Sequence, residues 1–536
     1  EAGHLVKEED YTIALATCSR CGTPIEYAIF PQWWLRMKPL AEEVLKGLRR
    51  GDIAFVPERW KKVNIDWLEN VKDWNISRQL WWGHQIPAWY SEDCQAVTVP
   101  KPERYLEDPT SCEACGSPGL KRDEDVFDTW FSSALWPLST LGWPEETEDL
   151  KAFYPGDVLV TGYDILFLWV SRMEVSGYHF MGERPFKNVL LHGLVLDEKG
   201  QKMSKSKGNV IDPLEMVERY GADALRFALT YLATGGQDIR LDLRWLEMAR
   251  NFANKLYNAA RFVLLSREGF QAKEDTPTLA DRFMRSRLSQ GVEEITALYE
   301  ALDLAQAARE VYELVWSEFC DWYLEAAKPA LKAGNAHTLR TLEEVLAVLL
   351  KLLHPMMPFL TSELYQALTG KEELALEAWP EPGGRDEEAE RAFEALKQAV
   401  TAVRALKAEA GLPPAQEVRV YLEGETAPVG ENLEVFRFLA RADLLPERPA
   451  KALVKAMPRV TARMPLEGLL DVEEWRRRQE KRLKELLALA ERSQRKLASP
   501  GFREKAPKEV VEAEEARLRE NLEQAERIRE ALSQIG

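Results

Sequence analysis

The sequence predicts a multidomain protein in which an α/β part precedes an all-α part, and three observations carry this prediction. From residue 31 to 236, β-branched apolar runs such as Gly156–Gly162 and Asn188–Asp197 alternate with amphipathic segments, the pattern of a parallel sheet covered by helices. From 237 to 380, nearly every segment has apolar residues at helical spacing, which predicts a helical bundle. From 471 to 536, apolar residues recur every three or four positions on both sides of a turn, which predicts an antiparallel coiled coil.

Two shorter regions complete the predicted division into domains. Residues 1–30 hold short β-rich pieces and are expected to end a small β domain. Residues 381–470 combine one helical segment, Ala392–Gly411, with the candidate strands Glu417–Gly424 and Lys451–Ala456, which predicts a small α+β module. A chain of 536 residues is long enough for several such domains, each with its own core.

The bulk composition argues against some functions. No apolar run reaches the roughly 18 residues of a membrane span, so no membrane association is expected. A formal net charge of -17 argues against binding nucleic acid through total charge, although local fields select partners. The first residues contain neither an initiating Met nor a signal peptide, so we expect a fragment of a longer cytoplasmic protein.

The coiled-coil segment carries a local excess of positive charge. Residues 476–497 contain nine Lys or Arg residues and three Glu residues, a net charge of +6 in a chain whose total is -17. Such a helix face is usually a solvated surface, but the same excess suits a phosphate backbone.

The stretch Leu196–Val210, LDEKGQKMSKSKGNV, contains four lysines and two glycines that permit movement. It follows an apolar strand pattern and precedes a helix with Asp212 as N-cap, Glu215 completing a capping box and Gly221 as C-cap. The loop therefore joins the end of a strand to the start of a helix, where parallel α/β sheets bind ligands. Its lysines can neutralise a polyphosphate, and a solvated basic loop is the alternative.

The pentapeptide Lys202–Ser206, KMSKS, is similar to the second signature of class I aminoacyl-tRNA synthetases. Five longer blocks resemble, in the expected order, those of the valyl-tRNA synthetase family: NISRQLWWGHQIPAWY (75–90), DVFDTWFSSALWPLSTLGWP (125–144), GYDILFLWVSRM (162–173), NFANKLYNAARFVL (251–264) and FCDWYLEAAKP (319–329). The resemblance covers essentially the whole chain and is far more specific than the pentapeptide alone.

This resemblance implies a role for each region. Residues 1–30 are similar to the end of an inserted editing domain, and 31–236 to the second half of a Rossmann-type catalytic domain with a zinc knuckle and the KMSKS loop. The regions 237–380 and 471–536 resemble an anticodon-binding bundle and a coiled-coil tRNA-binding arm, with the small module 381–470 between them. The family's first signature, of His-Ile-Gly-His type, is missing, so the chain alone is not expected to activate valine.

The activity implied by the resemblance is ATP-dependent attachment of valine to its tRNA through valyl-adenylate, with Mg²⁺ accompanying ATP. In the first step Lys202 and Lys205 would stabilise the α-phosphate and the departing pyrophosphate, while Ser204 helps to fix the loop. The implied ATP-binding residues are Lys202, Met203, Ser204, Lys205, Ser206, His192, Gly193, Val195, Gly162 and Asp164. For His192 taken alone, a structural histidine is an equal alternative.

Trp130 and Trp169 lie in two of the matching blocks and are expected to form flat walls of an apolar valine pocket. Discrimination by one methylene provides only about 1 to 3 kcal/mol, so the family needs a hydrolytic editing site, whose residues cannot be named from this sequence. Two other functions compete with this prediction. One is an isoleucyl-tRNA synthetase, which has similar blocks, and the other is a non-catalytic tRNA-binding fragment.

Two Cys-x-x-Cys pairs predict metal knuckles rather than disulfides in a cytoplasmic chain. Because structural Zn²⁺ prefers four ligands, the first pair needs a partner, either the second pair or a pair outside the sequence. We favour the latter, because Cys94 is a nearer third ligand for the second pair. Ser91 stands where relatives often have a fourth cysteine, and free cysteines are the alternative. The candidate zinc ligands are Cys18, Cys21, Cys94, Cys112 and Cys115.

The bundle and the arm supply candidate tRNA contacts. In the bundle, Lys255, Arg261 and Phe262 lie where cations and a ring can meet an unstacked base, although Phe262 is at least as well explained as a core residue. On the arm the candidates are Arg476, Arg477 and Lys481. The partners implied are tRNA, ATP and L-valine, and a monomer is expected.

The tryptophan-rich block 75–90 has two interpretations. Arg78 and His84 are candidates for contacting a ligand or the end of the tRNA. The favoured interpretation is structural, with Trp81 and Trp82 packing the insertion against the catalytic sheet.

Overall fold

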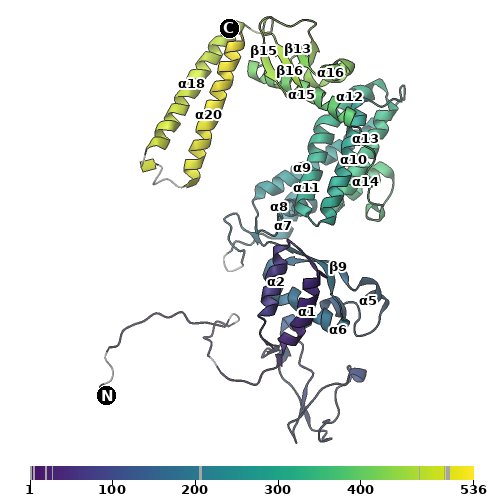
Figure 1. The fold of residues 1–536 in the computed structure, drawn as a ribbon, viewed down its shortest axis with the longest axis vertical. Helices are drawn as coiled ribbons and strands as arrows, with labels where there is room; N and C mark the ends of the chain where they lie inside the picture. Colours follow the sequence, from purple (N-terminus) through teal and green to yellow (C-terminus); the bar gives the residue numbers. More distant parts are fainter. Residues whose placement is uncertain are drawn as a thin grey trace. The chain divides into compact units, whose positions relative to one another are not determined.

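The computed structural model describes residues 3, 7–18, 21–26, 28–204, 208–469, 471–499, 501–502 and 508–535 (Figure 1). The chain forms two compact units, Glu1–Leu194 and Val195–Gly536. None of the described helices combines the length and the apolar character that spanning a membrane requires.

A parallel three-stranded sheet forms the centre of the first unit, as the sequence predicts. Its strands, in spatial order, are β2 (Ala54–Val56), β10 (Phe186–His192) and β9 (Gly156–Gly162). β10 is the middle strand, because Leu190 is paired with Val56 on one side and with Val160 on the other. The carboxyl ends of β9 and β10 coincide, since His192 is paired with Gly162.

Three helices share one core with this sheet. They are α1 (Met37–Arg50), α2 (Arg59–Glu69) and α6 (Ser171–Met181) (Figure 1). In α1 the buried residues Met37, Ala41, Val44 and Leu48 recur every three or four positions, which gives the helix one apolar face. Gly51 then ends α1 at φ 87°, a conformation that only glycine adopts readily.

Short elements complete the first unit. The strand pairs are β1 (Trp34–Leu35) with β3 (Trp74–Asn75) and β4 (Ser77–Arg78) with β8 (Val126–Phe127), and an antiparallel sheet has the order β6 (Val97–Thr98), β5 (Trp89–Ser91), β7 (Leu120–Arg122). The short helices are α3 (Thr129–Ala134), α4 (Trp136–Ser139) and α5 (Glu148–Phe153). Before residue 31, the described residues contain one β-bridge, between Thr17 and Pro24.

The second unit begins with β11 (Val195–Leu196), which pairs in parallel with β12 (Ile239–Arg240). Between them lie α7 (Pro213–Tyr220) and α8 (Ala222–Leu232). The Asp212 side chain caps α7 by accepting a hydrogen bond from the backbone N–H of Leu214. The expected capping box with Glu215 does not form, because Asp212 accepts from the N–H of Leu214 and not from that of Glu215, and the Glu215 carboxylate lies 3.8 Å from Arg219.

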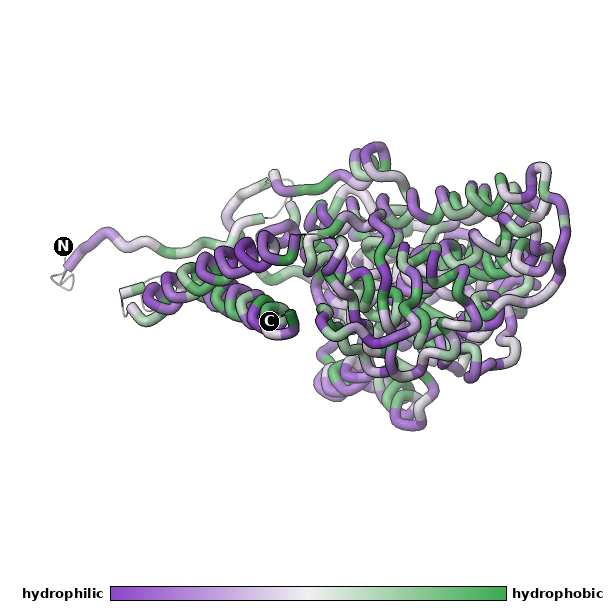
Figure 2. The backbone as a smooth tube through the Cα atoms, turned by 90° about the horizontal axis from the view of Figure 1, so that it is seen from above, coloured by the Kyte–Doolittle hydropathy of each residue, from purple (hydrophilic) through white to green (hydrophobic). Residues whose placement is uncertain are grey.

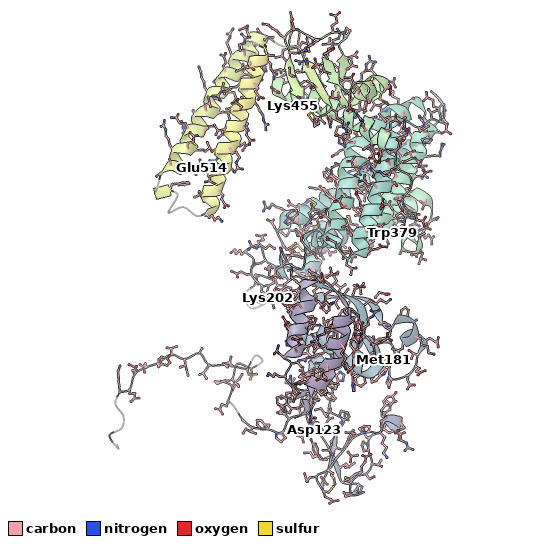
Figure 3. All side chains as sticks on the ribbon, viewed as in Figure 1. Asp123, Met181, Lys202, Trp379, Lys455 and Glu514 are labelled. Carbon is pink, nitrogen blue, oxygen red and sulfur yellow. The ribbon has the colours of Figure 1, made fainter. Side chains whose placement is uncertain are left out.

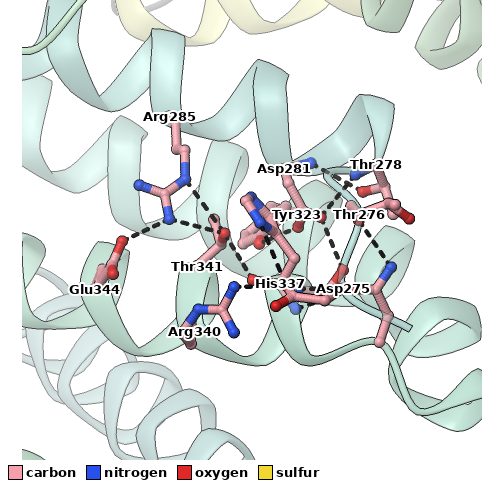
Figure 4. A network of polar contacts seen from close by, with 12 residues as sticks. Asp275, Thr276, Thr278, Asp281, Arg285, Tyr323, His337, Arg340, Thr341 and Glu344 are labelled. Carbon is pink, nitrogen blue, oxygen red and sulfur yellow. Dashed lines mark hydrogen bonds and ion pairs between the residues drawn. The ribbon is translucent and has the colours of Figure 1, made fainter. Parts of the chain in front are cut away.

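The predicted helical bundle follows. Its helices are α9 (Leu243–Arg267), α10 (Leu279–Glu300), α11 (Leu304–Glu313), α12 (Leu324–Ala333), α13 (Ala336–Leu353) and α14 (Pro358–Thr369), and a π-helical stretch, Leu314–Tyr323, joins α11 to α12. One buried carboxylate ties three of these elements together. Asp281 on α10 accepts hydrogen bonds from the Tyr323 hydroxyl at 2.7 Å, the Thr338 hydroxyl at 2.8 Å and the Thr278 backbone N–H at 2.9 Å (Figure 4).

A smaller α/β arrangement comes next. Helix α15 (Glu387–Ala410) packs against a four-stranded sheet of order β14 (Ala442–Leu444), β13 (Val418–Gly424), β16 (Val460–Met464), β15 (Leu453–Ala456), together with α16 (Ala427–Glu431) and α17 (Leu433–Ala440). Lys407 on α15 is buried, and its ammonium donates to the carbonyls of Ala440 at 2.8 Å and Arg441 at 2.9 Å. Arg404, one turn earlier, donates to the Leu439 carbonyl at 2.9 Å, so α15 caps the end of α17.

The last two helices, α18 (Val472–Ala498) and α20 (Lys508–Ile535), run antiparallel and side by side (Figure 1). Figure 2 shows apolar and polar residues alternating along both. Leu486 and Ala490 on α18 and Ala525 on α20 are buried. Glu514, labelled in Figure 3, accepts a hydrogen bond from Ser493 at 2.7 Å, so a polar contact lies between the two helices.

Candidate functional site

The lysine loop is held at its base by two polar side chains that sequence reasoning missed. Asp197 accepts hydrogen bonds from the backbone N–H groups of Lys199 at 3.0 Å and Gln201 at 2.7 Å. Asn209 donates to Asp197 at 2.9 Å and accepts from the Ser204 backbone N–H at 2.9 Å. The Asn209 amide, followed by the Gln201 backbone N–H, lowers the pKa of Asp197, which therefore stays ionised.

The described part of the loop leaves Lys202 exposed to solvent after β11 (Figure 3). Its backbone pairs with Leu196, and the Met203 sulfur accepts a hydrogen bond from the Ile211 backbone N–H at 3.4 Å. Val195 is half-buried in β11. The predicted residues Lys205 and Ser206 lie outside the described residues. The arrangement holds the start and the end of the loop and presents an ammonium group to solvent.

At the carboxyl edge of the parallel sheet, the first unit brings together four predicted residues. Gly162 ends β9, His192 ends β10, and Asp164 and Gly193 follow them directly. A Cβ on Gly162 would lie 2.8 Å from a carboxylate oxygen of Asp164, so a larger residue at position 162 would displace this side chain. His192 Nδ1 lies 2.8 Å from the Gly193 carbonyl oxygen, which orients the ring. Asp164 is exposed and available to accept hydrogen bonds.

The two predicted pocket tryptophans lie on elements that contact one another. Trp130 belongs to α3, and Trp169 belongs to the π-helical turn Leu166–Val170. The indole N–H of Trp169 donates to the Ser133 carbonyl on α3 at 3.0 Å. Trp130 lines a cavity of about 640 Å³, together with residues such as Trp67 and Trp74. Within the described part of the chain, Trp169 does not line this cavity; it packs beside Trp136 instead, with the ring centroids 5.8 Å apart.

Asp128 organises the polar side of this cavity. It accepts hydrogen bonds from Arg78 at 2.6 Å, the Trp74 indole at 3.0 Å and the Trp130 backbone N–H at 3.2 Å. The Arg172 guanidinium lies 3.7 Å from the same carboxylate and 3.6 Å from the centroid of the Trp74 ring. Arg78 is therefore tied into an ion-pair cluster, in agreement with the structural interpretation of this residue.

Trp81 and Trp82 contradict the expectation that they pack the insertion against the sheet. Their exposed fractions are 100% and 91%. Large apolar side chains are usually buried, but residues 81–83 form a bend between short strands, and none of the described elements covers the two rings.

A buried polar triad, not predicted from the sequence, lies behind the π-helical turn. Asn64 on α2 donates to the Glu174 carboxyl at 2.8 Å and accepts from the Ser171 hydroxyl at 2.6 Å. Ser171 also donates to the Leu166 carbonyl at 3.1 Å, at the start of the turn. Burial raises the pKa of Glu174 to about 8, so this acid is neutral near pH 7. No local pattern marks this triad, because Asn64 lies 107 positions from Ser171 and 110 positions from Glu174.

Three of the five predicted zinc ligands cluster. The sulfur atoms of Cys94, Cys112 and Cys115 all lie within 4.8 Å of one another. Among the described residues, Cys18 and Cys21 are not part of this group, and Cys21 donates to the Thr23 hydroxyl at 3.3 Å. Thiolates in such a group are a donor set that Zn²⁺ prefers, so the three clustered residues fit a metal ion.

The bundle candidates for tRNA contact divide into two kinds. Lys255 is engaged within the protein, since its ammonium lies 2.5 Å from Asp321 and 3.7 Å from the centroid of the Trp316 ring. Arg261 is exposed. Phe262 is half-buried and lines a cavity of about 450 Å³, whose wall also contains Phe270, Lys273, Lys328 and Lys332.

The arm candidates also divide into two kinds. Arg476 lies near the end of α20, 3.5 Å from the Ile535 carbonyl, and pairs with Glu473 at 3.3 Å. Arg477 and Lys481 are exposed to solvent. The exposed pair is thus the part of the predicted set that can meet an external anion.

Three family models match the chain. They are described as "tRNA synthetases class I (I, L, M and V)" over residues 6–242, "Anticodon-binding domain of tRNA ligase" over 281–422, and "Valyl tRNA synthetase tRNA binding arm" over 471–536. The first contains the sheet edge, the lysine loop and the thiol cluster.

Similar proteins agree with these matches. The chain is 99% identical over 536 residues to a valine–tRNA ligase of Thermus thermophilus and 45% identical over 544 residues to that of Thermotoga maritima, in each case covering 100% of this chain and 62% of the relative. The methionyl-tRNA synthetase of Mycobacterium tuberculosis in complex with methionyl-adenylate matches with a TM-score of 0.53 and 20% identity, over 69% of this chain and 71% of that one, which indicates a shared fold.

Proposed function

Since the chain belongs to the valyl-tRNA synthetase family of class I aminoacyl-tRNA synthetases, we propose that it forms part of an enzyme that attaches valine to its tRNA. The observation that carries this proposal is the 99% identity to a valine–tRNA ligase over 536 residues. Valine and ATP form valyl-adenylate and release pyrophosphate, and a ribose hydroxyl at the tRNA end then displaces AMP. An isoleucyl-tRNA synthetase is not favoured, because relatives from 42% to 99% identical are valine–tRNA ligases.

In the proposed first step, cations of the lysine loop act on the phosphates. Lys202 and Lys205 offset the negative charge that develops as pyrophosphate leaves, with Mg²⁺ accompanying ATP. Ser204 fixes the loop, and the hydrogen bond that its backbone N–H donates to the Asn209 side chain supports this role. Met203 and Ser206 complete the loop contribution to ATP binding.

The sheet edge is proposed to bind the nucleoside. Asp164 accepts hydrogen bonds from ribose hydroxyls, and Gly162 lets the nucleotide approach the backbone. His192, Gly193 and Val195 lie under the nucleoside in the same proposal. The convergence of Gly162, Asp164 and His192 at the end of two neighbouring strands supports this part, since ligands of parallel sheets bind there.

Trp130 and Trp169 are proposed to limit the size of the amino acid. The contact between α3 and the turn that carries Trp169 supports this assignment, because the Trp169 indole donates a hydrogen bond to the Ser133 carbonyl of the helix that carries Trp130. Hydrolytic editing is assigned to the inserted domain, of which residues 1–30 are proposed to be the end. The catalytic domain is proposed to extend over 31–236.

The remaining regions are proposed to bind tRNA. In the anticodon-binding bundle, 237–380, the cavity beside Phe262 combines aromatic rings with three lysines, which suits an unstacked base and its phosphates. Arg261 lies next to it in sequence, whereas Lys255 orders Trp316 and Asp321. The α+β module, 381–470, joins the bundle to a coiled-coil arm, 471–536, where Arg477 and Lys481 face the phosphate backbone and Arg476 steadies the helix pair.

We further propose a structural Zn²⁺ held by Cys94, Cys112 and Cys115. The ion neutralises the thiolates and joins the segment of Cys94 to that of Cys112 and Cys115. Cys18 and Cys21 are proposed to bind a second zinc ion with ligands outside this sequence. All six cysteines are free thiols, which supports a cytoplasmic location, and the enzyme is proposed to act as a monomer.

The test is valine-dependent exchange between ATP and pyrophosphate. We expect the chain alone to be nearly inactive. A longer polypeptide that also contains the region present in the relatives but outside this chain should catalyse the exchange, with valine preferred to isoleucine. A complete enzyme that binds tRNA but catalyses no exchange would establish the non-catalytic alternative.

The loop can be tested in the same complete enzyme. Lys202→Ala should slow exchange by about 100-fold or more, since one electrostatic contact to the transition state is lost. Lys199→Ala, which removes another cation of the same loop, is the matched control and should change the rate far less. Equal rates for Lys202→Ala and the parent would remove Lys202 from the mechanism.

A further inference from the structure

Three turns of the first unit share one pattern of backbone hydrogen bonds between their described residues. In each, the N–H of the first residue donates to the carbonyl five residues later, and the N–H of the fifth residue donates back to the carbonyl of the first. The pairs are Cys18 with Thr23 and Gly22, Ser91 with Ala96 and Gln95, and Cys112 with Ser117 and Gly116. The fifth residue has a positive φ in all three: 73° at Gly22, 61° at Gln95 and 71° at Gly116.

Two of these turns begin with cysteine and the third begins with Ser91. Because the hydrogen-bond pattern is the same, Ser91 takes in its turn, Ser91–Cys94, the place that Cys112 takes in Cys112–Cys115. The match extends to hydrogen bonds. The backbone N–H groups of Asp93 and Cys94 donate to the Ser91 hydroxyl oxygen at 3.3 and 3.4 Å.

In the turn Cys112–Cys115, the two corresponding backbone N–H groups contact a sulfur atom. The backbone N–H groups of Cys115 and Ala114 form hydrogen bonds to the Cys112 sulfur. Each turn therefore gathers two N–H groups on the heteroatom of its first residue, an arrangement that stabilises negative charge on that atom.

The turns Ser91–Cys94 and Cys112–Cys115 face one another with the spacing of a tetrahedral site. Cys94 Sγ is 3.6 Å from Cys112 Sγ, and Ser91 Oγ is 3.5 Å from Cys115 Sγ. Around a tetrahedral Zn²⁺ with sulfur at about 2.3 Å and oxygen at about 2.1 Å, the edges are about 3.8 Å between two sulfurs and about 3.6 Å between sulfur and oxygen. Both observed distances match the corresponding edge.

Burial distinguishes the four atoms. Ser91 is fully buried and Cys112 is nearly so, whereas Cys94 and Cys115 are exposed. A buried hydroxyl at the base of a thiol cluster contributes an oxygen to the site, and the exposed thiols leave the cluster open to exchange with solvent.

We propose that the hydroxyl oxygen of Ser91 is the fourth ligand of a mixed metal site formed with the thiolates of Cys94, Cys112 and Cys115. This rests on the structural zinc proposed above but not on the synthetase activity. A neutral hydroxyl is a weaker and harder ligand for Zn²⁺ than a thiolate, so the site holds the ion less tightly than four thiolates do and releases it more readily.

The experiment uses the full 536-residue chain, since the cluster needs no other polypeptide. Co²⁺ replaces Zn²⁺ as a spectroscopic probe, and a chromophoric chelator competes for Zn²⁺. Ser91→Cys should raise the thiolate-to-cobalt absorption by roughly one third, from three thiolates to four, and strengthen Zn²⁺ binding by about tenfold or more. Ser91→Ala should keep the absorption and weaken Zn²⁺ binding.

Ser117→Cys is the matched control. Ser117 follows the turn Cys112–Cys115 closely in sequence, but its hydroxyl accepts a hydrogen bond from the Gly119 backbone N–H at 3.1 Å. It should change neither readout. A Cys18→Ser, Cys21→Ser double variant removes the first pair from the spectrum. Identical cobalt spectra and zinc affinities for the parent, Ser91→Cys and Ser91→Ala would overturn the role of Ser91. Absence of thiolate-to-cobalt absorption in all three would overturn the metal site as well, and the exchange assay would remain a separate test of the synthetase.

Discussion

At the scale of single residues, the first unit contains an acid that the fold keeps neutral. Glu174 is fully buried, one of its oxygens accepts from Asn64 at 2.8 Å, and the other has no hydrogen-bond partner. Burial raises its pKa to about 8, against an ordinary value of 4.5. The folded chain therefore retains a proton on Glu174 that the unfolded chain releases above that ordinary value, and the stability contribution is lost as pH rises from about 4.5 to about 8.

Glu174→Gln tests this reasoning, because glutamine has the shape of the protonated acid and does not ionise. The variant should gain stability relative to the parent by roughly 4 kcal/mol between pH 5 and pH 9, since nearly three pKa units of the shift act in this range and each is worth about 1.4 kcal/mol. Calorimetric unfolding of both chains between pH 5 and pH 9 measures the difference. Glu42→Gln, at an exposed position of α1, is the control. Parallel stability curves for Glu174→Gln and the parent would show that Glu174 is ionised in the folded chain.

At the scale of elements, helix ends hold the bundle together through buried side chains. Asp281 is the third residue of α10 and forms a capping box with Thr278, a local feature, but its carboxylate also binds Tyr323 and Thr338 from two other elements (Figure 4). The same carboxylate thus caps the N-terminus of α10 and joins three elements. The C-terminus of α17, capped by Arg404 and Lys407 of α15, follows the same principle.

Asp281→Ala should therefore cost more than a helix cap. Loss of the carboxylate leaves the Tyr323 and Thr338 hydroxyls buried without an acceptor, so we expect a loss of about 3 kcal/mol in the free energy of unfolding. Asp303→Ala removes the N-cap of α11, where Asp303 is exposed and accepts from the Gln306 backbone N–H at 3.2 Å, and should cost about 1 kcal/mol. Chemical denaturation of both variants measures the two losses, and equal values would limit Asp281 to a capping role.

At the scale of the whole molecule, a strongly positive segment lies within a chain whose net charge is negative. The chain has a formal net charge of -17, whereas residues 476–497 of α18 carry +6. Because a phosphate backbone responds to the local field, the acidic total does not oppose the tRNA binding proposed for the arm. The pairing of α18 with α20 leaves Arg477 and Lys481 exposed, so both remain available for this contact.

The combined variant Arg477→Ala, Lys481→Ala should weaken tRNA binding and reduce the slope of log affinity against log salt by about two, one for each lost phosphate contact. Filter binding or fluorescence titration over a range of salt concentrations measures the slope. Lys371→Ala with Arg391→Ala is the matched control, because both of these cations are already paired with carboxylates, at 2.8 and 2.9 Å. An unchanged slope in the arm variant would exclude these two phosphate contacts.

Much of the architecture could be predicted from local patterns. Apolar spacing over a few turns predicted the bundle and the parallel sheet, whereas the resemblance to a known family indicated Gly162, Asp164 and His192, which the structure places at the ends of neighbouring strands. The capping box expected at Glu215 did not form, because the Asp212 side chain binds the N–H of Leu214 and not that of Glu215. The packing expected of Trp81 and Trp82 failed because residue type predicts burial only on average.

The sequence by itself determined the kinds of elements and their order, because helical and strand periodicities and turn residues act over a few neighbouring positions. Only the tertiary structure decided which polar groups meet: Glu174 with Asn64 across 110 positions, Asp281 with Tyr323 across 42, and Ser91 with Cys115 across 24. Such contacts leave no local pattern, because their energy depends on the removal of water from both partners, and burial of that kind exists only once distant segments have packed together.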